Sequence, residues 1–315
     1  GAVVLAARWF EVMQTHYSGS VVVAAFCLGA LLAVALMPSV GNLKLGYGST
    51  RDSSDVLEEA EPSTTQERAK ISTQAVSKSA WIAFKARNAL VKTDAETLRT
   101  YNELLRSHGN IFGFGDDGRE ILDAELRRLA GLKNEVVVLE VGVWLGKSSV
   151  RWAKVNERVR VIGIDPFLHP QSGHKLLEKV PDELKDRFGQ PEFNRGLAEH
   201  VTKSKGVQER VAFVTGFSPK DLVEPVFKNS IASEVAIIYI DGGKQKNYEA
   251  VRAYAEESLA MFAKHLPNAM LSGDDWNHPD NKGMEDAVRE YVKKNSLKLQ
   301  TSGRTWLVHP AEKAE

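Results

Sequence analysis

Val136-Val-Val-Leu-Glu-Val-Gly-Val-Trp-Leu-Gly-Lys-Ser-Ser-Val150 joins an apolar run to two glycines and a polar segment. The β-branched run at its start is typical of a strand that is covered on both faces. Gly142 can bend the backbone where a side chain would clash, and Gly146 allows a ligand or a packed helix to come close. Ser148 can cap or enter a following helix. The stretch predicts a buried strand, a glycine turn and a helix whose first N–H groups can face a ligand.

Three classes of ligand-binding turn share this outline. A phosphate-binding loop needs four residues between its glycine and Gly-Lys-Ser, whereas Gly142 and Gly146 are separated by three. The dinucleotide fingerprint needs Gly-x-Gly-x-x-Gly, of which only part is present. The third class has an acidic residue before the first glycine, as Glu140 is here, and Gly-x-x-x-Gly after it. A structural turn that binds no ligand is the remaining alternative.

The third pattern resembles motif I of the class I S-adenosylmethionine-dependent methyltransferases. More closely, Leu139-Glu-Val-Gly-x-x-x-Gly-x-Ser-x-Val-Arg-x-Ala153 is similar to the catechol and caffeoyl-CoA type O-methyltransferases. The resemblance implies that S-adenosylmethionine binds at this turn. The residues that it implies around the cofactor are Glu140, Gly142, Gly146 and Ser148.

Apolar runs alternate with helical stretches from residue 80 onward. Strands are predicted at 136–141, 160–165, 210–214, 235–240 and 268–273, with two more around the Ser-Gly turn within 297–309. The alternation predicts a parallel sheet with helices on both faces. We therefore expect an α/β fold, a Rossmann-like doubly wound sheet of about seven strands. An antiparallel C-terminal strand is what the methyltransferase resemblance implies.

Helix starts can also be predicted from the sequence. Thr93-Asp-Ala-Glu96 has the pattern of a capping box, so a helix should begin there and run to about Ser107. Asp117 can cap a second helix that ends near Gly131. A later helix carries an apolar stripe that we interpret as core and not as a cofactor site: Tyr248, Val251, Ala255, Leu259 and Phe262.

Residues 21–40 read VVVAAFCLGALLAVALMPSV and carry no charged side chain. About 20 residues at about 1.5 Å each span about 30 Å, the thickness of a bilayer core. We predict a transmembrane helix over 17–40, which would make this a single-pass membrane protein whose organelle and orientation stay open. A signal peptide cleaved after Ala33-Val-Ala35 and a buried core helix are the alternatives.

The rest of the chain divides by composition. Residues 1–16 form an N-terminal segment, and residues 41–79 are polar and poor in large apolar side chains, which predicts a solvated linker. Residues 80–315 are expected to form a methyltransferase-like domain, as the resemblance implies. Lys and Arg number 41, as do Asp and Glu, so no basic excess points to nucleic acid. Cys27 is the single cysteine, which excludes an intramolecular disulfide.

The predicted strands end in polar or glycine-bearing groups, and ligands of an open parallel sheet bind beyond the carboxyl ends of its strands. Asp165 ends the second strand, where a carboxylate can accept hydrogen bonds from both ribose hydroxyls of an adenosyl group. The resemblance places the ribose-binding acid at this position; a turn or N-cap Asp is the alternative. It also places Thr215-Gly-Phe-Ser218 beside the adenine, on which Phe217 could stack unless it is a core residue.

Asp241 follows the fourth strand, and Asp274 and Asp275 follow the fifth. Carboxylates so close would raise one another's pKa unless a cation lay between them, and oxygen ligands suit Mg²⁺ or a similar divalent cation. The catechol and caffeoyl-CoA type enzymes have Asp-x-x-Lys at the fourth strand and Asp-Asn at the fifth. The resemblance therefore implies these three acids as metal ligands, Asp241 also beside the cofactor, and Lys244 as the base. Lys246 is the alternative base, and Asp275 replaces the usual Asn.

The function that this resemblance implies is metal-assisted O-methylation of a small hydroxylated substrate, with S-adenosylmethionine as the donor. A metal lowers the pKa of a bound hydroxyl, and a neighbouring lysine can take its proton. The rival hypothesis is a catalytically inactive methyltransferase-like accessory subunit, whose partners are other subunits of a membrane complex. The long stretch between Asp165 and Arg210, which contains His169 and His174, could be a substrate lid or a docking surface.

Overall fold

The computed structural model describes residues 80–310 apart from 90–92, 109–116, 169–181 and 243–246. These residues all belong to one compact unit, Glu61–Glu315. The predicted segment 1–16, transmembrane helix 17–40 and linker 41–79 lie outside the described residues and stay predictions. Within the described ranges, no helix combines the length and the apolar character that crossing a membrane requires.

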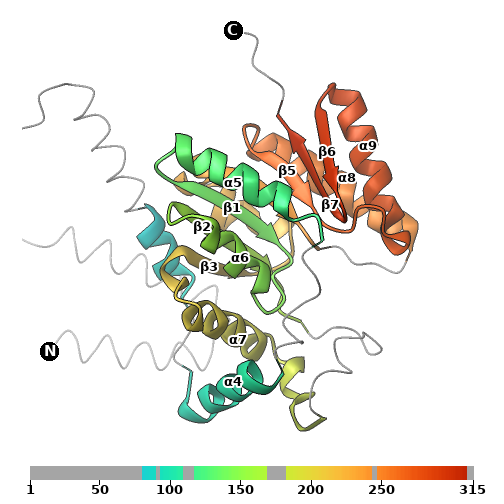
Figure 1. Ribbon diagram of the computed structural model, residues 1–315. Coiled ribbons are helices and arrows are strands. Elements are labelled where there is room, and N and C mark those ends of the chain that lie inside the picture. Colours follow the sequence, from blue (N-terminus) through green and yellow to red (C-terminus); the bar gives the residue numbers. More distant parts are fainter. Residues whose placement is uncertain (1–79, 90–92, 109–116, 169–181, 243–246, 311–315) are drawn as a thin grey trace, which may run out of the picture. The chain divides into compact units, whose positions relative to one another are not determined.

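A seven-stranded sheet forms the middle of the domain, in the order β3-β2-β1-β4-β5-β7-β6 (Figure 1). Its strands are β1 (Val136–Val141), β2 (Val159–Asp165), β3 (Val211–Thr215), β4 (Val235–Ile240), β5 (Met270–Gly273), β6 (Lys298–Ser302) and β7 (Thr305–His309). Strands β1 to β5 are parallel, and β7 is antiparallel to both β5 and β6. The predicted doubly wound α/β sheet with an antiparallel C-terminal strand is confirmed.

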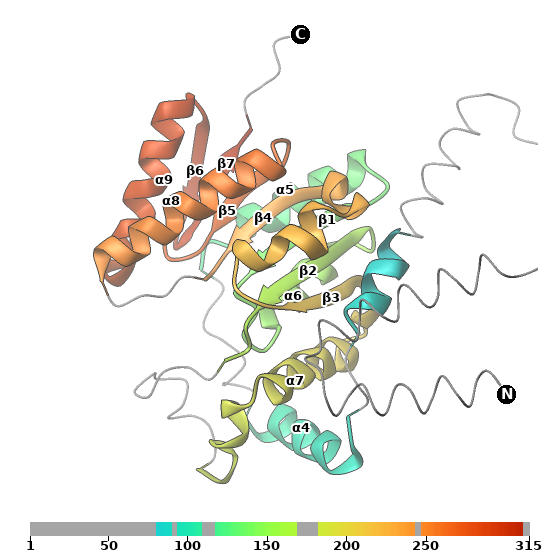
Figure 2. The same cartoon turned by 180° about the vertical axis from the view of Figure 1, so that it is seen from behind.

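Helices cover both faces of this sheet (Figures 1 and 2). On one face lie α5 (Glu120–Leu132) and α6 (Lys147–Val155), with α7 (Pro191–Ser204) and α4 (Ala95–Ser107) beyond them toward β3. On the other lie α8 (Tyr248–His265), α9 (Lys282–Asn295) and a helix over 80–87. Single turns complete the described elements: Asp182–Leu184, Arg187–Gly189, Gln208–Arg210, Lys220–Leu222, Val223–Phe227, Ser230–Glu234 and Pro279–Asn281.

Strand β1 is buried along its whole length, as its apolar run predicted. Successive side chains of a strand point to opposite faces. Val136 and Val138 therefore pack in the core under α5 and α6, while Val137 and Leu139 pack in the core under α8. By the same alternation Glu140 points toward α6, which decides what its carboxylate contacts.

Two predicted helix starts are wrong in detail. The N-cap of α4 is Asp94 and not Thr93, because Asp94 Oδ1 accepts a hydrogen bond from Thr97 N at 2.8 Å. Asp117 does not cap α5, whose N-cap is Arg119 without a side-chain cap bond. Asp117 instead lies against the β6–β7 hairpin, where its carbonyl accepts a hydrogen bond from Thr305 Oγ1.

The apolar stripe predicted on α8 is core, with one exception. Val251, Ala255, Leu259 and Phe262 are buried. Tyr248 is the first residue of α8, and 39% of its surface is exposed.

Candidate functional site

The carboxyl ends of β1 to β5 meet along one edge of the sheet, where the ladder of backbone hydrogen bonds continues past the strands. The N–H groups of Gly142, Gly216, Asp241 and Asp274 each donate to a carbonyl at the end of the neighbouring strand, at 2.7–3.1 Å. The predicted convergence of strand-end groups is therefore present. In order along the edge, the row contains Gly216, Asp165, Gly142, Asp241 and Asp274.

The turn after β1 requires glycine at position 142. Its φ is +87°, and a Cβ there would lie 2.3 Å from the carbonyl oxygen of Asp241. Gly142 thus lets the ends of β1 and β4 approach closely. Gly146 is the N-cap of α6 with φ of +81°, and a Cβ there would meet Ala198 of α7 at 3.4 Å. Of the two roles considered for Gly146, the structure shows close packing against a helix.

Asp165 closes the same turn. Its Oδ2 accepts hydrogen bonds from Val143 N at 2.8 Å and Trp144 N at 2.9 Å, and its Oδ1 accepts one from Phe167 N at 2.6 Å. Burial raises the pKa of Asp165, and these three N–H groups act in the opposite direction. The carboxylate therefore binds backbone groups of the glycine turn, which lie before the first N–H groups of α6 that we expected to face a ligand. A carboxylate offers about four acceptor positions, so Oδ1 can still accept from a ribose hydroxyl.

Glu140 is fully buried beneath α6. Its Oε2 accepts a hydrogen bond from Ser149 Oγ, and Ser148 beside it is also buried. Burial raises the pKa of Glu140 to about 7, although Ser148, Ser149 and Arg119 act to lower it. Ser148 enters α6 and does not cap it. The described contacts of both predicted cofactor residues are thus internal, and their role toward a cofactor stays a prediction.

Phe217 lies in the loop after β3 with 58% of its surface exposed, so the alternative of a core Phe is wrong. Its backbone N–H donates to Asp221 Oδ2 at 2.8 Å, which fixes the loop. The next residue, Ser218, precedes a cis peptide bond to Pro219. The exposed ring stands at the end of the strand next to Asp165, where the resemblance implied an adenine.

Arg119 is a site residue that sequence reasoning missed. Its Nη2 lies 3.1 Å from Asp274 Oδ2 and 3.5 Å from Asp241 Oδ2. Only 6% of its surface is exposed, and the guanidinium carbon lies 5.4 Å from the ring centre of Tyr239. An arginine before a helix usually reads as a surface residue. The sequence did contain one indication of such a residue. The acids predicted at the strand ends carry negative charge that a nearby cation has to neutralise.

Asp275 does not share this arrangement with the other two acids. Its backbone has φ of +63°, and its carboxylate pairs with Arg304 and accepts a hydrogen bond from Asn281 Nδ2. In the described part of the chain, no three His, Cys, Asp or Glu side chains are grouped to hold a metal ion. The predicted metal ligands therefore do not fit a divalent ion here, because Arg119 bridges two of them and Arg304 holds the third.

Other predicted residues lie outside the described ranges. Lys244 and Lys246 fall within 243–246, and His169 and His174 within 169–181. The role of Lys244 as base and that of the long stretch as a lid or docking surface thus stay predictions.

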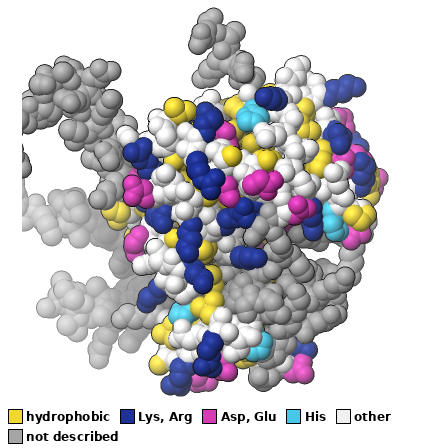
Figure 3. Space-filling view, viewed as in Figure 1, with side chains coloured by type: hydrophobic (Ala, Val, Ile, Leu, Met, Phe, Trp, Pro, Cys, Tyr) yellow, Lys and Arg dark blue, Asp and Glu magenta, His cyan; other side chains and the backbone are white. Residues whose placement is uncertain are grey.

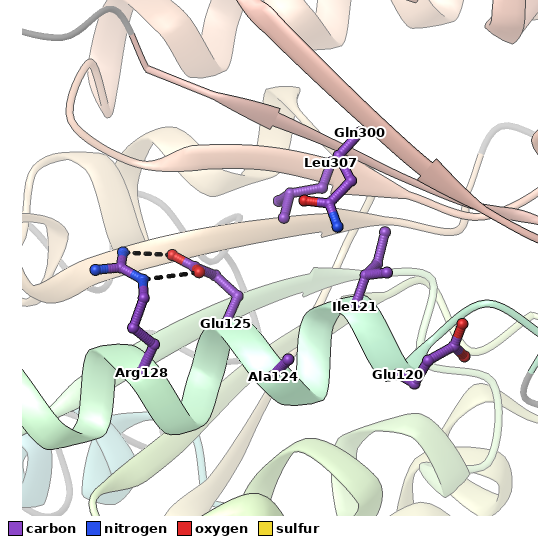
Figure 4. Close-up of a pocket in the computed structure, with 7 residues that line it drawn as sticks. All are labelled: Glu120, Ile121, Ala124, Glu125, Arg128, Gln300 and Leu307. Carbon is purple, nitrogen blue, oxygen red and sulfur yellow. Dashed lines mark hydrogen bonds and ion pairs between the residues drawn. The ribbon is translucent and has the colours of Figure 1, made fainter.

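Two hollows in the described surface lie away from the row of strand ends. One of about 360 Å³ runs between α5 and the β6–β7 hairpin (Figure 4), lined by Glu120, Ile121, Ala124, Glu125, Arg128, Gln300 and Leu307. The other, about 540 Å³, lies where β5 and β6 begin and β7 ends. Neither contains a predicted site residue. On the face shown in Figure 3, positive and negative side chains are interspersed, in keeping with the zero net charge.

Residues 139–276 match a family model described as a methyltransferase domain. The match begins in β1 and ends just after β5, so it contains the whole row of strand ends. No curated protein matches this chain.

Several solved structures resemble the chain. The O-methyltransferase TomG from Streptomyces achromogenes, in complex with S-adenosylmethionine, is 17% identical; the match covers 76% of this chain and 99% of that one, with a TM-score of 0.39. An O-methyltransferase from Bacillus cereus, in complex with S-adenosylhomocysteine, is 16% identical over 73% and 99% of the two chains, also with a TM-score of 0.39. Both TM-scores are low. The proposed function therefore rests on the strand-end geometry and on the family match.

Proposed function

We propose that this chain, whose residues 139–276 match a methyltransferase family model, uses S-adenosylmethionine to methylate a hydroxyl group of a small molecule. The observation that carries the proposal is the row of strand-end groups around Gly142. It joins the motif I turn, the acid at the end of β2 and the loop of Phe217 along one edge.

These residues fit an adenosyl group. Gly142 brings the backbone of β1 and β4 close together, Asp165 keeps acceptor capacity at Oδ1, and Phe217 exposes an aromatic face on which an adenine can stack. When bound, S-adenosylmethionine supplies a methyl group that is already activated for transfer. The protein then has to orient the acceptor oxygen and remove its proton.

Lys244 is the residue that we propose takes this proton, with Lys246 as the alternative. A lysine can act as a base when its surroundings lower its pKa. Lys244→Ala and Lys246→Ala form a matched pair for this question. The substitution of the true base should lower kcat while leaving the affinity for S-adenosylmethionine unchanged, and the other should change neither. Equal effects of both substitutions would contradict the assignment.

The decisive experiment is titration calorimetry of the full chain with S-adenosylmethionine, followed by a transfer assay on phenols and catechols. We expect saturable binding and a methylated product. No binding at millimolar cofactor would refute the enzymatic function. It would favour the second candidate, an inactive accessory subunit of a membrane complex. The observation that supports this candidate is that Asp165 accepts hydrogen bonds from Val143 N and Trp144 N, two backbone groups of the glycine turn.

We also propose that residues 17–40 anchor the protein in a membrane, on the evidence of the uncharged run 21–40. Carbonate extraction of membranes that contain the full chain should leave the protein in the pellet. A variant without residues 17–40 should move to the supernatant. Release of the full chain by carbonate would contradict the anchor.

A further inference from the structure

Two acidic strand ends share one buried guanidinium. Arg119 Nη2 is within ion-pair distance of both Asp241 and Asp274, which follow the neighbouring strands β4 and β5. The side chains of all three residues are at least four-fifths buried. In such surroundings charges interact strongly, and an unbalanced pair of carboxylates would be unfavourable.

Two aromatic rings also lie close to the guanidinium of Arg119. Its carbon atom lies 6.0 Å from the ring centre of Trp152 on α6 and 5.4 Å from that of Tyr239 on β4. Cation–π contacts at such distances favour a delocalised cation that keeps its charge at all physiological pH values. Arg119 is therefore a buried, fixed component of the site and not a surface side chain that extends into it.

We propose that Arg119 is the resident cation of the acidic strand ends, occupying the place where the sequence predicted a divalent ion, so that methyl transfer by this chain needs no metal. The second half of this statement rests on the proposed function. Arg119 is a positioning residue: it neutralises and orients Asp241 and Asp274. Asp275 is not available as a third ligand, because Arg304 and Asn281 hold its carboxylate.

A consequence for the substrate class follows. A divalent ion favours acceptors with two adjacent hydroxyls, since both oxygens can replace its bound waters. Without such an ion, an acceptor with one hydroxyl should serve as well as one with two. We therefore expect simple phenols and catechols to be methylated at comparable rates, and a strict requirement for adjacent hydroxyls would contradict the proposal.

The direct test is Mn²⁺ binding, measured by electron paramagnetic resonance on the full chain without cofactor. We expect no saturable binding to the wild type at millimolar Mn²⁺. Arg119→Gln should bind Mn²⁺ at least about tenfold more tightly, because one opposing charge is removed from beside two carboxylates. Arg119→Lys, which keeps the charge, should behave like the wild type. Arg304→Gln is the matched control at Asp275 and should not create a comparable site.

Stoichiometric Mn²⁺ binding to the wild type, abolished by Asp241→Asn, would overturn the proposal. So would a folded Arg119→Gln variant that gains no Mn²⁺ affinity. The wild-type measurement does not depend on whether any variant folds. Failure of S-adenosylmethionine binding in separate calorimetry would refute the enzymatic function but leave the Mn²⁺ result intact, so the two failures are distinguishable. Where methylation is measured, a chelator should leave its rate unchanged.

Discussion

The Nη2 atom of Arg119 lies 3.1 Å from Oδ2 of Asp274, although 155 positions separate the two residues in the chain. Arg119 precedes α5 on one face of the sheet, and Asp274 follows β5 at its edge. The ion pair therefore links a helix start to the last parallel strand. Because both side chains are largely buried, removing one of them leaves the other as an uncompensated charge.

Arg119→Gln should lower the free energy of unfolding by about 3–5 kcal/mol, the range for breaking a buried ion pair. Lys228→Gln is the control. Lys228 pairs with Glu224 on the surface, with 63% and 76% of the two side chains exposed, so its loss should cost less than about 1 kcal/mol. Urea unfolding followed by circular dichroism measures both. Similar losses of unfolding free energy in the two variants would show that the Arg119 ion pair contributes no more to stability than a surface ion pair.

Glu140→Gln should change how stability depends on pH. Burial raises the pKa of Glu140 from 4.5 to about 7, so the folded state holds a proton that the unfolded state has lost between these values. The stability that this proton gives is complete below pH 4.5 and lost as the pH rises through about 7, a change on the order of 3 kcal/mol. Glutamine should remove this component. Thermal unfolding across that pH range measures it, and identical profiles for the two proteins would contradict the assignment.

Gly142→Ala should destabilise the protein and weaken binding of S-adenosylmethionine. The positive φ disfavours alanine by about 1–3 kcal/mol, and the new Cβ would also clash with the carbonyl oxygen of Asp241. Gly131→Ala is the control, since a Cβ in this part of α5 would meet no atom within 4 Å. It should stabilise the protein by about 0.5–1 kcal/mol. Urea unfolding of both variants tests the pair, and the expectation fails if their effects have the same sign.

Phe217→Ala should weaken the binding of S-adenosylmethionine while leaving stability almost unchanged. Stacking of an aromatic ring on a base contributes about 1–3 kcal/mol, which corresponds to a rise in Kd of roughly fivefold to 150-fold. The ring is 58% exposed, so folding should change by less than about 0.5 kcal/mol. Leu132→Ala, at a side chain that is 72% exposed on α5, should alter neither quantity. Calorimetry gives the affinities, and equal Kd values for Phe217→Ala and the wild type would exclude stacking.

The strands were predictable because their signals are local. The apolar run of β1 and the glycine at position 142 predicted a buried strand and its turn, and the predicted strand bounds agree with the structure to within two residues. Helix caps were less predictable, because Thr93 and Asp94 are both good N-cap residues and only the geometry selects Asp94. The row of strand ends followed from the parallel sheet, in which all carboxyl ends lie on one edge.

The sequence by itself determined the αβα architecture, the glycine turn that resembles a methyltransferase motif and which acids stand at the sheet edge, since each depends on patterns within a few residues. Only the tertiary structure decided what those acids contact. Arg119 reaches Asp241 and Asp274, Asp165 turns to the backbone of the glycine turn, and Asp275 turns to Arg304. The physical reason is that buried carboxylates must be paired or hydrogen-bonded, and many distant residues can supply the partner.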